Sequence, residues 1–228
     1  MSSYLLETED LGLCISQRWL FRNLGISIPP QSFVGVTGPS GVGKTSLLRL
    51  LASDLQADEG KVFSHLQGGQ NTAMIFQDLQ LADGASTLHN ALGGSLGRHS
   101  GISTFFNFPK QEKEAANNWL EKFGLVGKSR QWASTLSRGE RQRLAICRTL
   151  LSSPTLLLAD EPVASLDSEW AGQTLQILKD SQIQKGGSLV CSLHDEDQVQ
   201  RFADFVLRLH PSDPTSWSWE TLSKRTEA

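Results

Sequence analysis

The sequence predicts an α/β fold with a parallel-sheet core, an antiparallel N-terminal β subdomain and an inserted, mostly helical segment. Three observations predict it. An apolar strand, a glycine-rich turn and a helix follow one another between residues 33 and 52. Several further apolar runs of strand length each end in polar residues. The strand pattern also stops between Asp78 and about Ser137 and then resumes.

The N-terminal stretch from Tyr4 to Ile28 mixes polar and apolar positions and predicts two antiparallel strands. Pro29 and Pro30 end this pattern. Residues Lys61–Phe63 predict a further short strand. We expect these strands to form a small subdomain ahead of the main sheet.

The glycine-rich turn has the spacing GxxxxGK(S/T), which is typical of a nucleoside triphosphate site. Glycines let backbone N–H groups approach phosphate oxygens, and the helix that follows adds its positive end. Lys44 can reach the β- and γ-phosphates, and the Thr45 hydroxyl can bind Mg²⁺. A chance glycine-rich turn is the alternative, but the strand before it and the helix after it argue against this. The candidate binding residues are Gly38, Pro39, Ser40, Gly41, Val42, Gly43, Lys44, Thr45 and Ser46.

Polar residues follow three other apolar strands. Gln77 follows Ala73–Phe76, which we predict to be buried; Asp160 and Glu161 follow Thr155–Ala159; His194 follows Leu189–Leu193. Ligands bind at the carboxyl ends of strands in an open parallel sheet, so one crevice could collect all of these side chains.

Each of these residues has a role in triphosphate hydrolysis. Asp160 is suited to Mg²⁺ or its water, Glu161 to polarising the attacking water, Gln77 to Mg²⁺ or that water, and His194 to the γ-phosphate. Taken singly, Glu161 could be a helix-start carboxylate, Gln77 a loop residue and His194 a helix cap. Their joint occurrence favours a catalytic site.

The remaining elements divide the chain into a core and an insertion. Lys110–Phe123 predicts an amphipathic helix closed by Gly124, while Leu92–Arg98 is a glycine-rich connector and 102–108 is apolar without period. Helices are also expected over 141–151 and 168–180, and a last strand over 205–209. We expect one domain, with residues 1–77 and 152–228 as the nucleotide-binding core and 78–151 as the inserted helical subdomain. For residues 211–228 the sequence pattern predicts no particular role.

The stretch from Leu136 to Arg143 predicts a second anion site. The hydroxyl of Ser137, the N–H of Gly139 and a helix N-terminus are all suited to phosphate oxygens. Since the glycine-rich loop already holds one γ-phosphate, this second site suggests a nucleotide bound to another copy of the chain. An ordinary capped basic helix is the alternative.

Composition excludes several classes of function. A net charge of −3 and a pI near 6.0, with no dense basic block, argue against a nucleic-acid partner. Cys14, Cys147 and Cys191 are scattered, so neither zinc nor a disulfide framework is indicated. No signal peptide and no apolar run of membrane-spanning length is expected. A role at a membrane would therefore need partner proteins.

The candidate motifs are the glycine-rich loop, the polar residues at the strand ends, the stretch from Leu136 to Arg143 and the segment Ser165–Asp167. Taken together and in their order along the chain, they resemble the motifs of the ATPases of ATP-binding cassette (ABC) transporters. The resemblance implies a P-loop NTPase core of RecA-like type, binding ATP and Mg²⁺. Thr45, Gln77 and Asp160 would serve the metal, Glu161 would be the general base and His194 the switch histidine. Ser137 and Gly139 would close over the partner's γ-phosphate, with Asp167 at the dimer interface.

The resemblance also implies partners. These are a second cassette, with ATP sandwiched between the copies, a pair of membrane permease subunits and an extracytoplasmic solute-binding protein. The chain would lie peripherally on the cytoplasmic face of the inner membrane.

The chain departs from the family pattern at two places. Arg138 and Glu140 stand where the usual signature has a second glycine and a glutamine. Ile15 stands where an aromatic residue usually stacks on adenine, and Trp19 is a nearby substitute.

The sequences of the helical insertion and of the segment Leu158–Asp167 are similar to those of phosphonate importer ATPases. They favour phosphonate or phosphite as the solute. Another solute, moved in either direction, is the alternative within the family. A stand-alone phosphotransferase would use the same glycine-rich loop but not the Ser137–Gly139 signature. A nucleic-acid-linked ATPase is disfavoured by the charge.

Overall fold

The computed structural model describes residues 3–68, 71–98 and 108–222. They form two compact units. The first contains the described residues up to Met74, then Thr155–Glu161, then those from Leu175 onward. The second contains Ile75–Pro154, as far as it is described, and Pro162–Thr174. The chain therefore leaves the first unit and returns to it more than once.

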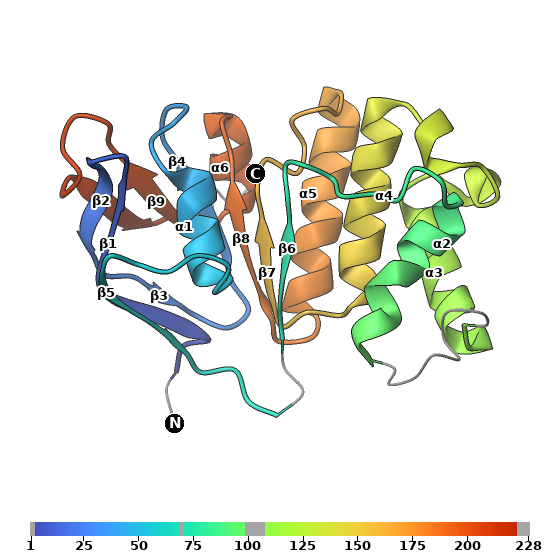
Figure 1. Cartoon of the computed structure of the whole chain (residues 1–228), viewed down its shortest axis with the longest axis horizontal. Helices are drawn as coiled ribbons and strands as arrows, with labels where there is room; N and C mark the ends of the chain where they lie inside the picture. Colours follow the sequence, from blue (N-terminus) through green and yellow to red (C-terminus); the bar gives the residue numbers. More distant parts are fainter. Residues whose placement is uncertain (1–2, 69–70, 99–107, 223–228) are drawn as a thin grey trace, which may run out of the picture. The chain divides into compact units, whose positions relative to one another are not determined.

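The first unit begins with a small antiparallel sheet (Figure 1). Its central strand β1 (Leu6–Ile15) pairs with β2 (Arg18–Leu24), β3 (Ser27–Ile28) and β5 (Glu59–Ser64). The predicted antiparallel strands at the N-terminus and at 61–63 are confirmed. The short strand β3 is an addition, which ends just before Pro29 and Pro30.

A six-stranded sheet follows, in the order β10-β9-β4-β8-β7-β6. Strand β4 lies parallel to both β8 and β9, and β7 lies parallel to β8. The carboxyl ends of β4, β7 and β8 therefore share one edge of the sheet, as predicted. The strands are β4 (Phe33–Thr37), β6 (Thr72–Ile75), β7 (Leu156–Ala159), β8 (Ser188–Ser192), β9 (Phe205–Leu209) and β10 (Trp217–Thr221).

Two predictions about this sheet are wrong. Strand β9 is not the last, because β10 pairs with it in antiparallel fashion and stacks Trp219 on Phe205 at 5.6 Å between ring centroids. Strand β6 is not buried throughout, since only Ile75 is buried. Its place at the edge of the sheet explains this, because an edge strand has a neighbour on one side only.

Helix α1 (Lys44–Leu51) joins the two sheets into one core. Its leucines belong to a buried cluster that also contains side chains of β1, β2, β4, β7, β8 and β9. The loop between β4 and α1 is thereby fixed at both ends by buried elements. The helical residues of α1 in this cluster are Leu47, Leu48, Leu50 and Leu51.

Two helices complete the first unit. Helix α5 (Ser168–Ile183) crosses the boundary between the units, and α6 (Glu196–Phe202) follows β8. The cap of α6 is Asp195, whose side chain accepts the N–H of Asp197. His194 is therefore not the capping residue of this helix.

The second unit is helical. It contains α2 (Thr87–Leu92), α3 (Lys110–Lys122), α4 (Arg138–Leu151) and the short 3₁₀ helices η1 (Gly93–Arg98), η3 (Val126–Lys128) and η4 (Ala133–Thr135) (Figure 1). The predicted helix over 110–123 is confirmed, and Gly124 follows it with a φ of 66°. Most of the apolar stretch 102–108 lies outside the described residues. Within the described ranges, no helix combines the length and apolarity that crossing a bilayer requires.

Candidate functional site

The glycine-rich loop lies between β4 and α1, and three of its glycines have a positive φ, which is 75° at Gly41. Gly38 and Gly43 have φ values of 141° and 114°, which side chains rarely allow. A Cβ on Gly38 would also lie 2.6 Å from the Leu209 carbonyl oxygen, and one on Gly43 would lie 3.1 Å from Cβ of Leu20. Leu209 at the end of β9 and Leu20 within β2 therefore lie close against the loop.

The N-terminus of α1 is suited to an anion. No side chain caps it, and its first turn contains no acidic residue. The first helical residue is instead Lys44, a cation at the positive end of the helix dipole. This arrangement is unfavourable by itself and becomes favourable when a negative group binds there.

The Lys44 side chain folds back over the loop. Its ammonium donates to the carbonyl oxygens of Gly38 at 2.8 Å and Pro39 at 3.2 Å, and the residue is only 5% exposed. Burial lowers the pKa of Lys44, and attraction to Glu161 and Asp160 opposes this change. These carbonyl oxygens are uncharged acceptors, which a charged phosphate could replace.

Asp160 lies at the end of β7, buried to 1% exposure, and both of its oxygens are bonded to hydroxyl groups. The Thr45 hydroxyl donates to Oδ2 at 2.7 Å, and the Ser192 hydroxyl donates to Oδ1 at 2.7 Å. Three elements, α1, β7 and β8, therefore meet at this carboxylate. The hydroxyl and carboxylate oxygens are hard donors of the kind that Mg²⁺ prefers.

Glu161 comes next in the chain and is more accessible, with its side chain 21% exposed. Its backbone has a φ of 47°, a conformation that is uncommon outside glycine. The Ser192 hydroxyl accepts the Glu161 N–H at 2.8 Å and so helps to hold this conformation. The Glu161 carboxylate contacts Nε2 of His194 at 2.5 Å.

The second unit contains the other predicted residues. Ser137 caps α4 in a capping box, in which its hydroxyl accepts the Glu140 N–H and the Glu140 carboxylate accepts the Ser137 N–H. Gly139 packs closely on the chain at Ser165, since an added Cβ would lie 3.3 Å from that carbonyl oxygen. Gln77 is exposed and follows β6 by two residues.

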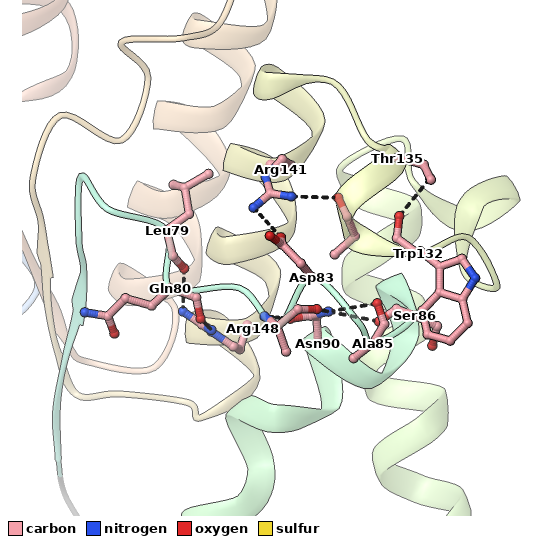
Figure 2. A network of polar contacts seen from close by, with 12 residues as sticks. Leu79, Gln80, Asp83, Ala85, Ser86, Asn90, Trp132, Thr135, Arg141 and Arg148 are labelled. Carbon is pink, nitrogen blue, oxygen red and sulfur yellow. Dashed lines mark hydrogen bonds and ion pairs between the residues drawn. The ribbon is translucent and has the colours of Figure 1, made fainter.

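The segment after Gln77 is anchored by two arginines of α4, as Figure 2 shows. Arg148 donates to the carbonyl oxygens of Leu79 at 2.8 Å and Gln80 at 2.6 Å. Arg141 pairs with Asp83 at 2.7 Å. Burial lowers the pKa of Arg148, but arginine stays charged at any physiological pH.

Asn90 of α2 forms further hydrogen bonds to the backbone of the same segment (Figure 2). Its side-chain oxygen accepts the Ala82 N–H at 2.8 Å, and its amide donates to the carbonyl oxygens of Ala82, Ala85 and Ser86. A hollow of about 300 Å³ with a mainly apolar lining lies beside this network. Its lining residues are Gln80, Ala82, Ala85, His89, Asn90, Gly93, Leu96, Phe108 and Arg148.

Comparison with known proteins identifies the family. The family model described as "ABC transporter" matches residues 21–164, which is more than half of the chain. The chain belongs to the ABC transporter family. The resemblance predicted from the motifs is thereby confirmed.

Two curated relatives illustrate the likeness within the family. The phosphite import ATP-binding protein PxtA of Stutzerimonas stutzeri is 36% identical over 201 residues, which cover 84% of this chain and 73% of the relative. The phosphonates import ATP-binding protein PhnC of Shigella sonnei is 32% identical over 223 residues, covering 90% and 85%. The predicted similarity to phosphonate importer ATPases is confirmed by these relatives.

Solved cassettes share the fold. The dimeric structure of MJ0796, a bacterial ABC transporter cassette, superposes with a TM-score of 0.82 at 22% identity, covering 96% of this chain and 99% of that chain. A nucleotide-free ATP-binding cassette gives a TM-score of 0.79 at 20% identity, covering 97% and 92%. The predicted P-loop NTPase architecture is confirmed at this level.

The structure brings together Lys44, Thr45, Asp160, Glu161 and His194 in the first unit, and it places Gln77, Ser137 and Gly139 in the second. The sequence prediction missed Ser192, which bonds to both Asp160 and the Glu161 backbone. A serine at the end of an otherwise apolar strand was the available signal. The role of Arg148 was also missed, because an arginine inside a helix usually indicates a solvated face.

The predicted adenine partner stays a prediction. Trp19 lies in β2 opposite Cys14, and the guanidinium of Arg22 lies 4.3 Å from the centre of its ring. Ile15 is 46% exposed at the end of β1.

Proposed function

We propose that this chain is the ATP-hydrolysing subunit of an ABC transporter that imports a phosphonate or a phosphite-like solute through partner permeases. The observation that carries the proposal is the geometry around Asp160 and Glu161. One carboxylate is buried and bonded to two hydroxyls, while the next is accessible and bonded to a histidine. This difference in surroundings is suited to two roles, with Asp160 beside the metal ion and Glu161 as the general base.

Phosphate binding is assigned to the glycine-rich loop and α1. The candidate residues from Gly38 to Ser46 line this turn, and their backbone N–H groups would donate to phosphate oxygens. Lys44 would exchange the Gly38 and Pro39 carbonyls for the β- and γ-phosphates, which are stronger acceptors because they are charged.

The oxygen donors present fit Mg²⁺. Thr45 and Asp160 would hold the ion together with phosphate oxygens and water, and Gln77 is the proposed further ligand. The bound ion would neutralise charge that develops on the phosphates. The hydrogen bond from the Thr45 hydroxyl to the Asp160 carboxylate supports this assignment, because it keeps the two oxygen donors close together.

Proton transfer is assigned to Glu161. Its carboxylate would accept a proton from the water that attacks the γ-phosphorus, and His194 would donate a hydrogen bond to the γ-phosphate. The contact between His194 Nε2 and the Glu161 carboxylate supports this pairing of roles, because it holds the two side chains together.

The functional unit is proposed to be a dimer of cassettes with ATP sandwiched between them. Ser137 and Gly139 would contact the γ-phosphate held by the partner's loop, and Asp167, which accepts the Trp170 N–H, would lie near that interface. The apolar hollow beside Gln80 and Arg148 is proposed to receive the permease. The complete assembly would include a pair of permeases and a solute-binding protein, with this chain on the cytoplasmic face of the inner membrane.

Uptake of a labelled aminophosphonate tests the proposal directly. Cells that carry the permease together with native protein are compared with cells that carry Glu161→Gln. We expect uptake to require Glu161 and the purified variant to hydrolyse ATP about 10²-fold more slowly or worse, because the general base is lost. If the native chain hydrolyses ATP but no phosphonate enters, the ATPase assignment stands and another solute is indicated.

Two further measurements test the nucleotide site. Lys44→Ala should lower the affinity for ATP by about tenfold or more, since a charged donor is removed. Light scattering of Glu161→Gln with ATP and Mg²⁺ should show a persistent dimer. A monomer under these conditions, or unchanged binding by Lys44→Ala, would contradict the assignment.

A further inference from the structure

The unusual signature residue Glu140 has a definite place in the structure. Its carboxylate accepts the Ser137 N–H at 2.9 Å through Oε2 and contacts the Lys128 ammonium at 2.5 Å through Oε1. Lys128 ends the 3₁₀ helix η3, nine residues before Ser137 in the sequence. The capping box of α4 is therefore extended by a lysine from a separate element.

This carboxylate is charged and partly buried. The Glu140 side chain is 17% exposed and that of Lys128 is 37% exposed. The hydrogen bond from Lys128 is the largest cause that lowers the pKa of Glu140, and the bonds to Ser137 act in the same direction. Glu140 therefore carries a full negative charge at neutral pH.

A negative charge here has opposite effects on the helix and on the proposed ligand. An acidic residue in the first turn stabilises a helix, because it faces the positive end of the dipole. The proposed function, however, puts another molecule's γ-phosphate at Ser137, and an unpaired carboxylate bonded to that residue would repel it. A glutamine at this position would avoid the conflict because it carries no charge.

A nearby arginine of the same helix does not offer an equivalent contact. Arg143, one turn along α4, has its guanidinium carbon 3.9 Å from the centre of the Trp170 ring. Attraction to Glu140 partly offsets the effect of burial on the Arg143 pKa, so this arginine acts on Glu140 only through space. The direct partner is Lys128.

We propose that Lys128 is the positioning residue that makes a glutamate compatible with the signature of this cassette. It neutralises Glu140 and holds the carboxylate in the capping box, so that Ser137 and Gly139 can accept the partner's γ-phosphate. The inference rests on the proposed function, because it needs ATP between two copies of the chain.

The test compares four purified full-length variants with the native chain. Lys128→Met removes the ammonium and keeps the aliphatic stem, Glu140→Gln removes the carboxylate charge, and the double variant removes both. Lys110→Met is the matched control, since Lys110 pairs with Glu114 at 3.5 Å on the exposed face of α3 in the same unit. For each protein the KM and kcat of ATP hydrolysis, ATP-dependent dimerisation and the affinity of the monomer for a fluorescent ATP analogue are measured.

We expect Lys128→Met to raise the KM for ATP and to weaken ATP-dependent dimerisation, each on the order of tenfold, because the repulsion by Glu140 is no longer compensated. Monomer affinity should stay unchanged, since it depends on the Lys44 loop. The double variant should recover to within about twofold of native, as should Glu140→Gln alone, because neither has a negative charge at position 140 that could repel the γ-phosphate. Lys110→Met should resemble the native chain.

Rescue separates a charge effect from a structural one. If the double variant is as impaired as Lys128→Met, or if Lys128→Met resembles the native chain, the inference is overturned. A native chain that neither hydrolyses ATP nor dimerises with it overturns the proposed function and the inference together. An active native chain without rescue overturns only the inference.

Discussion

The strand-end site of the first unit and the segment from Leu79 to Asn90 in the second unit are held by different kinds of contact. The strand-end site is held mainly by short side chains, because the hydroxyls of Thr45 and Ser192 both donate to the buried Asp160 carboxylate. Its residues are Lys44, Thr45, Asp160, Glu161, Ser192 and His194. The segment from Leu79 to Asn90 is irregular and depends on long arginine side chains from α4.

This difference has a physical reason. In the sheet, backbone pairing fixes the ends of β4, β7 and β8, so a hydroxyl needs to span only a hydrogen-bond length to reach Asp160. The loop segment has no such ladder, and its carbonyl groups need side-chain donors instead. The positions of the residues in the strand-end site are therefore fixed by pairing of the strands, whereas those in the segment from Leu79 to Asn90 are fixed by individual side chains.

The largest effect is expected at Ser192, which joins the two adjacent carboxylate residues. Ser192→Ala removes a donor to the buried Asp160 and an acceptor for the Glu161 N–H. We expect a loss of about 3 kcal/mol in the free energy of unfolding and at least about a tenfold lower kcat, because a buried charged group loses a partner. Urea denaturation and steady-state ATP hydrolysis measure the two effects.

Ser188→Ala is the matched control for this prediction. Ser188 lies at the other end of β8 and is also fully buried, donating to the Pro29 carbonyl oxygen at 2.6 Å. It should lower stability but leave kcat near the native value. Equal losses of kcat in both variants would show that Ser192 has only a structural role.

A smaller effect is expected at Arg148. Arg148→Met leaves the carbonyl groups of Leu79 and Gln80 without their donor and should cost about 2 kcal/mol of stability. Hydrogen exchange should become faster in residues 79–83, while the affinity for nucleotide should change little. Arg130→Met, at an exposed arginine of the same unit, should have no measurable effect. Unchanged exchange in 79–83 would mean that the segment is held by other contacts.

The β9–β10 pair tests the edge of the main sheet. Trp219→Ala removes a ring stacked on Phe205 and should cost about 1–2 kcal/mol without changing nucleotide affinity. Trp132→Ala, at a ring that is 57% exposed, should change the free energy of unfolding by less than about 0.5 kcal/mol. A similar loss in both variants would contradict the assigned packing of Trp219.

The smallest effect is expected from the ion pair between Glu196 and Arg208. The hydrogen bond from Arg208 is the main cause that lowers the pKa of Glu196 to about 2 from an ordinary 4.5. Because the folded-state pKa is lower, the stabilisation is present above about pH 4.5 and is lost as the pH falls toward 2. The Glu196 side chain is 53% exposed, so the pair should contribute less than about 1 kcal/mol.

Native protein and Glu196→Gln should therefore differ at pH 7 and converge at about pH 2, as followed by urea denaturation. A difference that grows as the pH falls would contradict this assignment.

The residue pattern was enough to predict the α/β core, the glycine-rich loop, the strand-end carboxylates and the helical insertion, and hence the family. These features are local: a strand, a turn and a helix follow from hydrophobic period and from glycine spacing within a few residues. It did not reveal β10, because Trp217–Thr221 is short and its pairing with β9 depends on the tertiary arrangement.

The side chains that support the site could be recognised only in the folded chain. Ser192 bonds to Asp160 across 32 positions of sequence, and Arg148 reaches Leu79 across 69. The compensation of Glu140 by Lys128 likewise joins two separate elements. A sequence pattern records the type of each residue, whereas these contacts exist because folding brings distant segments within about 3 Å, the length of a hydrogen bond.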